Sequence, residues 1–251
     1  MNGAVDSRPA RRVPLVLGLL VLAACWLGPL PALAKGSFAA HMTMHMGVVA
    51  LGTGLVALGL AGSRLDPARH WPRWFAPIPA SGVEAVVVWA WHAPVLHHAA
   101  RHRPEALLAE QGSFLAAGLF LWLSAFGGEP DRGGTTTAAT TGRAAAGVLG
   151  LLLTSMHMTL LGALLALTPR PLYAHGGAGG ALGLAALTDQ HLGGAIMLLV
   201  GGVSYLAGGL WLTAGVLRGG GWRGARGSAN PGGRRADAVA SRIAAGSEEH
   251  P

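Results

Sequence analysis

The chain has 251 residues, of which 51% are hydrophobic and 12% are charged, and its formal net charge is +7 at pH 7. A soluble globular protein carries about twice this share of charged residues, so the composition argues against a soluble enzyme and a disordered scaffold. The basic residues lie between and after long apolar runs, which argues against a nucleic-acid-binding module. The single cysteine, Cys25, excludes an intrachain disulfide and a cysteine-ligated zinc or iron–sulfur site.

Residues 1–34 have the pattern of a signal peptide or of a first transmembrane helix. Three arginines precede the apolar run 13–27, and the small-residue motif Ala32-Leu33-Ala34 follows it. Cys25 ends a Leu-Ala-Ala-Cys motif that resembles a lipoprotein processing site, in which case it would carry a lipid anchor. Cleavage, retention and lipidation all remain open, and each places residue 35 on the outer side.

Further apolar runs are long enough to cross a bilayer, since about 20 apolar residues span its hydrocarbon core. They cover residues 38–63, 81–100, 106–127, 143–168 and 190–216. The sequence therefore predicts an all-α, polytopic transmembrane helical bundle with five to six spans, whose transmembrane domain is 35–216. Residues 217–251 are rich in Gly and Arg and predict a disordered basic tail.

The basic residues predict the orientation. With the N-terminus inside, 14 of the 18 lysines and arginines face the same side, which the positive-inside rule assigns to the cytoplasm. The tail is then cytoplasmic, and its charge suits anionic membrane lipid rather than nucleic acid. Only Lys35, Arg101, Arg103 and Arg170 are predicted to face outward.

In this orientation most histidines fall in the outer half of the bundle. His41 and His45 stand at i and i+4, with Met44 near the same helical face. His92 lies in the outer half of its span, and we expect Pro94 to bend the helix just beyond it. Intramembrane ionisable groups are costly and mark functional sites. The candidate metal ligands are His41, His45, His92, His157, His191 and Met44.

The donor types indicate the metal. Imidazole suits copper, zinc and haem iron, and a thioether favours Cu(I). Metal-bound imidazoles need partners that orient them, and the candidates for that role are Glu110, Gln111, Asp189 and Gln190. We expect the remaining outer histidines (His97, His98, His102 and His175) to be solvated rim residues, and Glu84 to be a helix-start or interfacial carboxylate.

The chain resembles the polytopic cytochrome c oxidase assembly factor family (CtaG type) over about residues 40–215. The resemblance implies a non-enzymatic helical protein of the bacterial cytoplasmic membrane that helps cytochrome c oxidase to mature, with copper supply as its role and oxidase subunits as partners. The matching stretches are His41-Met42-Thr43-Met44-His45, Trp89-Ala90-Trp91-His92-Ala93-Pro94, Ser113-Phe114-Leu115-Ala116-Ala117-Gly118, Leu161-Gly162-Ala163-Leu164-Leu165 through Pro171-Leu172-Tyr173, and Asp189-Gln190-His191-Leu192-Gly193-Gly194.

The family's first-helix histidines fall on His41 and His45, its Trp-His-x-Pro histidine on His92, and its Asp-Gln pair on 189–190. Members usually carry Glu-His where this chain has Glu-Gln at 110–111, and Gln where it has His191. They also often have seven spans.

The hypothesis is a protein that binds copper, as Cu(I), at its outer face and passes it to the oxidase. Two alternatives stay open. One is a membrane b-type haem protein with a redox function, and the other is a copper transporter. A transporter needs polar groups through the whole membrane, whereas the inner halves of the spans are almost wholly Ala, Leu, Val and Gly. A homo-oligomer is compatible with the sequence.

Overall fold

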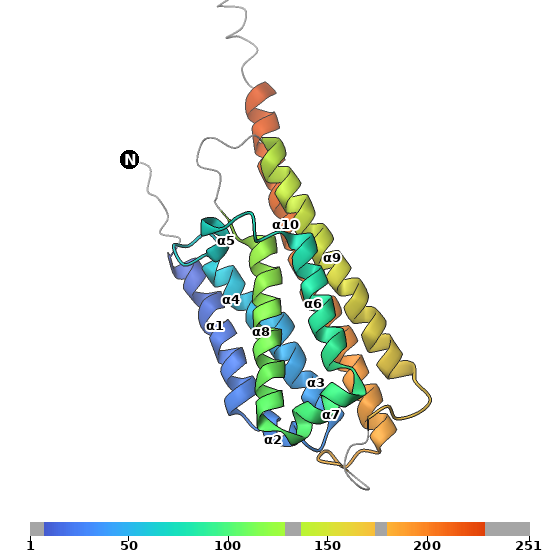
Figure 1. Cartoon of the computed structure of the whole chain (residues 1–251). Coiled ribbons are helices and arrows are strands. Elements are labelled where there is room, and N and C mark those ends of the chain that lie inside the picture. Colours follow the sequence, from blue (N-terminus) through green and yellow to red (C-terminus); the bar gives the residue numbers. More distant parts are fainter. Residues whose placement is uncertain (1–7, 129–136, 174–179, 229–251) are drawn as a thin grey trace, which may run out of the picture. The chain divides into compact units, whose positions relative to one another are not determined.

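The structure is a computed structural model that describes residues 8–128, 137–173 and 180–228. These residues form helices and no strand, which confirms the predicted all-α class. The chain divides into two units, residues 1–212 and 213–251, and the packing discussed below lies within the first. The helices (Figure 1) are α1 (Arg8–Leu27), α2 (Leu30–Ala34), α3 (Phe38–Met46), the π-helix η1 (Gly47–Gly52), α4 (Thr53–Leu60), α5 (Pro67–His70), α6 (Pro77–Trp91), α7 (Pro94–His102), α8 (Pro104–Phe126), α9 (Thr137–Leu167) and α10 (Ala186–Ser228).

Four segments of the described chain are long and apolar enough to cross a membrane. They are Phe38–Leu60, Pro104–Phe126, Thr141–Leu167 and Ala186–Leu217. The chain is therefore a membrane protein, but the predicted count of five to six spans is not confirmed. One reason is α6, whose 15 residues extend only about 22 Å, less than the hydrocarbon core of a bilayer.

Two of the predicted spans are not regular helices. The first consists of α3, η1 and α4, so a π-helix occupies its middle directly after His45 and Met46, and such π-segments occur often at functional sites. The second predicted span, 81–100, is broken rather than bent: α6 ends at Trp91 and α7 starts at Pro94. Proline has no N–H to continue the helical hydrogen bonds, which explains where the break falls.

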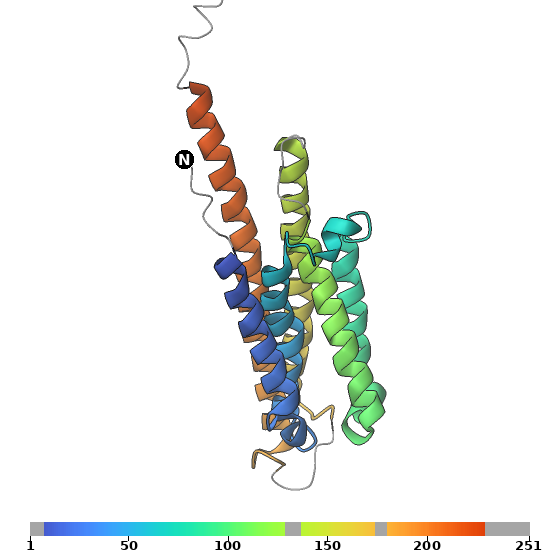
Figure 2. The same ribbon diagram turned by 90° about the vertical axis from the view of Figure 1, so that its left-hand side faces the viewer.

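Helix α1 packs along η1 and α4 (Figure 2). The approach is close because glycines line it: a Cβ added at Gly18 would lie 2.7 Å from Val56 N, and one at Gly59 would lie 2.6 Å from Leu15 Cβ. Cys25 is buried at this contact. The interpretations of residues 1–34 as a cleaved signal peptide, a lipoprotein signal or a retained helix remain predictions.

The C-terminal region begins inside α10. This helix continues to Ser228, so it includes the first residues of the predicted tail 217–251. Residues 229–251 lie outside the described part of the chain.

Candidate metal centre

Four histidines are gathered near the start of α3, the α6–α7 break and the first turns of α8. We call His41, His45, His92 and His97 the histidine cluster. All four are buried, with exposed fractions between 0 and 7%. The ring centroids of His41 and His97 are 4.7 Å apart, and those of His45 and His92 are 5.3 Å apart. Because His41 and His45 are one turn apart on α3, the two pairs are neighbours.

A hydrogen-bonded chain of side chains orients His41. Its Nε2 lies 3.0 Å from Glu110 Oε1, and since a carboxylate oxygen accepts, this pairing places the hydrogen on Nε2. Gln111 Nε2 donates to Glu110 Oε2 at 3.1 Å, and Trp26 Nε1 donates to Gln111 Oε1 at 3.2 Å. In a neutral ring, His41 Nδ1 then carries the lone pair. This buried atom has no hydrogen-bond partner among the described residues.

The second pair also presents nitrogen lone pairs to the interior. His92 Nδ1 lies 2.7 Å from the carbonyl oxygen of Val88, which can only accept, so the hydrogen is on Nδ1 and the lone pair on Nε2. His92 Nε2 and both ring nitrogens of His45 are buried without a hydrogen-bond partner in the described chain. The ring of Phe114 covers His45 at a centroid distance of 4.0 Å. Buried polar atoms of this kind are costly unless something binds them.

His97 connects these residues to a carboxylate. Ligand atoms of His41, His97 and Glu110 lie within 4.8 Å of one another, close enough to hold one metal ion. The solvated position predicted for His97 is therefore wrong, whereas His98 and His102 are exposed as predicted. His175 lies outside the described residues.

Asp189 fixes the helix that carries His41 and His45. Its carboxylate accepts from the Ser37 hydroxyl at 2.7 Å and from the backbone N–H groups of Phe38 and Ala39 at 2.6 and 3.1 Å. It therefore caps the N-terminus of α3, where the helix dipole favours a negative charge. In the structure Asp189 binds the Ser37 hydroxyl and two backbone N–H groups of α3, and its role in orienting an imidazole stays a prediction.

The break at His92 is held by Tyr173. The Tyr173 hydroxyl donates to the carbonyl oxygen of His92 at 2.7 Å. Burial raises the pKa of this phenol to about 12, so it stays a donor at any physiological pH. Its ring also stacks on Phe38 and contacts His97, with centroid distances of 4.8 and 4.4 Å. Tyr173 thus ties the start of α3 to both sides of the break.

The remaining predicted site residues are His157, His191, Gln190 and Met44. His157 makes no hydrogen bond with either ring nitrogen and has no ring contact with the cluster in the described chain. His191 Nε2 donates to the Thr168 carbonyl oxygen at 2.9 Å. The side chain of Gln190 accepts from the Leu172 N–H at 2.7 Å and donates to the Leu165 carbonyl oxygen at 3.3 Å. Asp189, Gln190 and His191 therefore bind the polypeptide backbone where the end of α9 and the starts of α10 and α3 lie close together. Met44 is buried and lines a cavity with Trp26 and Gln111.

A buried polar group away from the cluster was missed by sequence reasoning. Glu84 is fully buried in α6, and not interfacial, and it accepts from the Tyr205 hydroxyl at 2.7 Å. Nearby, Thr154 donates to Ser81 at 2.9 Å. Glu84, Val88 and His92 are spaced by four residues, so they share one face of α6. This spacing could have predicted that Glu84 is buried, because it places Glu84 on the same helical face as His92.

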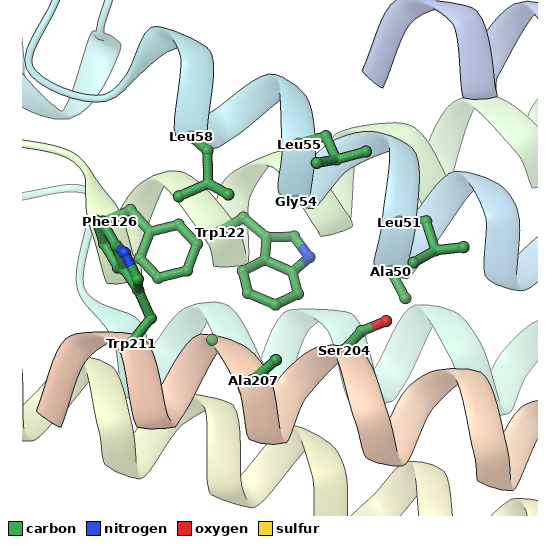
Figure 3. Close-up of a pocket in the computed structure, with 11 residues that line it drawn as sticks. Ala50, Leu51, Gly54, Leu55, Leu58, Trp122, Phe126, Ser204, Ala207 and Trp211 are labelled. Carbon is green, nitrogen blue, oxygen red and sulfur yellow. The ribbon is translucent and has the colours of Figure 1, made fainter. Parts of the chain in front are cut away.

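A separate cavity of about 280 Å³ opens between α4, α8 and α10 (Figure 3). The indole of Trp122 lies at its centre, with Leu55 and Leu58 on one side and Ala207 on the other. None of the described residues that line it is a His, Cys, Asp or Glu. The cavity therefore offers an apolar surface and not a metal site.

The sequence profile of one family, described as cytochrome c oxidase caa3 assembly factor (Caa3_CtaG), matches residues 3–219. The chain belongs to this family. No curated protein and no solved structure gives a significant match. Membership indicates a role in cytochrome c oxidase assembly and an association with that oxidase, and it favours a non-catalytic role.

The two residues that depart from the family pattern each make specific contacts in the structure. Gln111, which stands where members usually carry His, links Glu110 to Trp26. His191, which stands where they usually carry Gln, binds the Thr168 carbonyl. Neither position belongs to the histidine cluster.

Proposed function

We propose that this assembly factor binds copper, as Cu(I), through the histidine cluster and delivers it to cytochrome c oxidase. The observation that carries the proposal is the set of buried ring nitrogens without hydrogen-bond partners in the described chain: His41 Nδ1, His92 Nε2 and the two nitrogens of His45, one of which has a lone pair in the neutral ring. Imidazole is a good copper ligand, and Glu110 and the Val88 carbonyl orient two of the rings as the outer partners of metal-bound histidines do.

The spacing of the rings favours a single small ion over haem. Axial histidines of a b-type haem stand on opposite sides of a porphyrin, which needs room between them. The rings of His45 and His92 are instead in edge contact, with an interplanar angle of 78°. A single metal ion beside both rings suits this contact better than a porphyrin between them.

The packing also favours delivery over transport. A conduction path would need polar groups through the whole membrane. Glu84 is such a group below the cluster, but fully buried Val88 separates it from His92 on the same face of α6. We therefore assign the cluster to binding and transfer on one side, which the charge distribution predicts to be the outer side.

The direct test is Cu(I) affinity, measured anaerobically by competition with a chromophoric chelator. Variants His41→Ala, His45→Ala and His92→Ala should each lose most of the bound copper, while His98→Ala, which removes an exposed histidine, should bind as the wild type does. A wild-type protein that binds no Cu(I), or three cluster variants that bind it normally, would refute the proposal. An intense visible band in the purified protein would support the haem alternative.

Delivery needs a cellular test. Deletion should reduce copper-loaded oxidase while leaving synthesis of its subunits intact, and added copper should partly restore activity by mass action. The His45→Ala variant should behave like the deletion, and His98→Ala should restore activity fully. Normal oxidase activity in copper-limited deletion cells that hold no second family member would contradict the delivery role.

A further inference from the structure

Two adjoining cavities lie where α1, α2, α7 and α8 meet, at the end of α8 that begins with Pro104. The first, about 530 Å³, is lined by the side chains of Lys35, Arg101 and Arg103. We call it the basic pocket. The second, about 500 Å³, is lined mainly by apolar groups, among them Trp26, Leu108 and Leu115. We call it the apolar cavity. Both are lined by Pro31, Pro104 and Leu107, so they are neighbours.

The basic pocket gathers charges that are rare on its side of the protein. Only four basic residues are predicted to face outward, and three of them line this pocket; the fourth, Arg170, does not. No acidic side chain lines the pocket in the described chain. The Arg101 guanidinium also donates to the Lys35 carbonyl oxygen, which ties α7 to the turn before α3 and gives the pocket a fixed wall. Such a concentration of positive charge is complementary to a phosphate.

The apolar cavity continues inward from this charge. Its α8 residues run from Pro104 to Leu115, which corresponds to about 16 Å along a helix. The same residues begin one of the candidate membrane spans, Pro104–Phe126. A charged pocket therefore adjoins an apolar cavity along a candidate spanning helix, which suits a phospholipid headgroup and its acyl chain.

We propose that the basic pocket and the apolar cavity together bind one anionic phospholipid, with its phosphate between Lys35, Arg101 and Arg103 and an acyl chain against Leu108 and Leu115. The proposal does not depend on copper binding. It does place the acyl chain beside Gln111, which lines the cavity and holds Glu110. The bound lipid then covers the side of the Glu110 network that faces α1.

The test is native mass spectrometry of the full-length protein in detergent, with phosphatidylglycerol and phosphatidylcholine of identical acyl chains. The wild type should prefer phosphatidylglycerol. The double variant Lys35→Gln/Arg103→Gln should bind it about 25-fold more weakly, from about fivefold for each charge removed. Both side chains are exposed, so folding should be preserved. Arg170→Gln, which removes an exposed outward charge outside the pocket, is the matched control and should change nothing.

A second pair of variants tests the apolar part. A Cβ added at Gly112 meets nothing within 4 Å, and Gly112 lines the apolar cavity. Gly112→Leu should fill the cavity and weaken both lipids by a similar factor. Gly202 is equally open but lies on α10 outside the cavity, so Gly202→Leu should bind lipid normally.

Three results would overturn the proposal. The first is phosphatidylglycerol binding by the double variant that equals that of Arg170→Gln. The second is displacement of the lipid by millimolar inorganic phosphate, which would identify a free-anion site. The third is equal binding by the two glycine variants. Cu(I) titration of the same proteins separates this outcome from the copper proposal, because none of the altered residues belongs to the histidine cluster.

Discussion

His97 offers the sharpest test of the metal centre, because the structure buries it beside His41 and Glu110 while the sequence pattern places it at a solvated rim. The informative change is His97→Phe. It removes both ring nitrogens and keeps an aromatic ring against Phe38 and Tyr173, whose centroids lie 5.4 and 4.4 Å from that of His97. Packing is therefore largely retained while the ligand atoms are lost.

The expected loss follows from the position of His97 in the site. Removing a residue that only orients a metal ligand costs about 10–100-fold in metal affinity. A direct ligand should cost at least the upper end of that range, so we expect about 100-fold weaker Cu(I) binding, or about 2.8 kcal/mol. Copper competition titrations measure this difference, and thermal melting of the metal-free proteins checks that the fold is intact.

The neighbouring residue provides the control. His98→Phe changes an exposed ring on the same helix and should leave the Cu(I) affinity within about twofold of the wild type. If His97→Phe and His98→Phe bind copper equally while His45→Ala loses it, then His97 is a packing residue. The metal would in that case be held without His97.

Three further predictions concern the frame of the site. Glu110→Gln should weaken Cu(I) binding by about 10–100-fold, measured by the same titration, because it removes the carboxylate that orients His41. Asp189→Ala should lower the free energy of unfolding of the metal-free protein by about 3 kcal/mol, measured by denaturant titration, because three donors at the start of α3 lose a charged acceptor. The mature protein should retain α1, since Trp26 bonds to Gln111 and Cys25 is buried. Intact mass spectrometry checks this, and a mature chain that starts at residue 25 or 35 would contradict it.

Apolar composition, together with the charged, Pro and Gly residues that bound each apolar run, was enough to predict the long helices. Helix α8 spans Pro104–Phe126, against a predicted run of 106–127, because charges and Pro or Gly bound an apolar stretch at both ends. The count of spans was harder, since it depends on length. The sequence of 81–100 is mostly apolar, but the break at Pro94 leaves no single helix long enough to cross a bilayer.

The same break explains why His97 was missed. On an unbroken helix, residues five apart point about 140° away from each other, so His92 and His97 could not face one site. Because α7 starts afresh at Pro94 and packs on α8, His97 turns towards His41. Helical spacing and predicted depth were enough to group His41, His45 and His92, because their placement does not depend on the break. Their partners Glu110 and Gln111 were also found, because both lie one to two turns into α8.

Residues that bind backbone were the hardest to interpret. Asp189, Gln190 and His191 carry side chains typical of a metal site, yet each bonds to main-chain atoms of a distant segment. Nothing in the local sequence distinguishes an acid that orients an imidazole from one that caps a helix 150 residues away. Only the packing of α10 against the start of α3 decides between these roles.

These contacts bear on how the protein could release a bound metal ion. A structural metal site usually folds only when the metal binds, so its loss unfolds the protein. In this chain Asp189 fixes α3, Tyr173 fixes the break at His92, and Glu110 fixes His41, all through bonds that do not involve a metal. His41 and the backbone of His92 are therefore held in place without a metal. A metal that is not needed for folding can be given up to an acceptor by ligand exchange, which is the property that a copper donor requires and a structural site lacks.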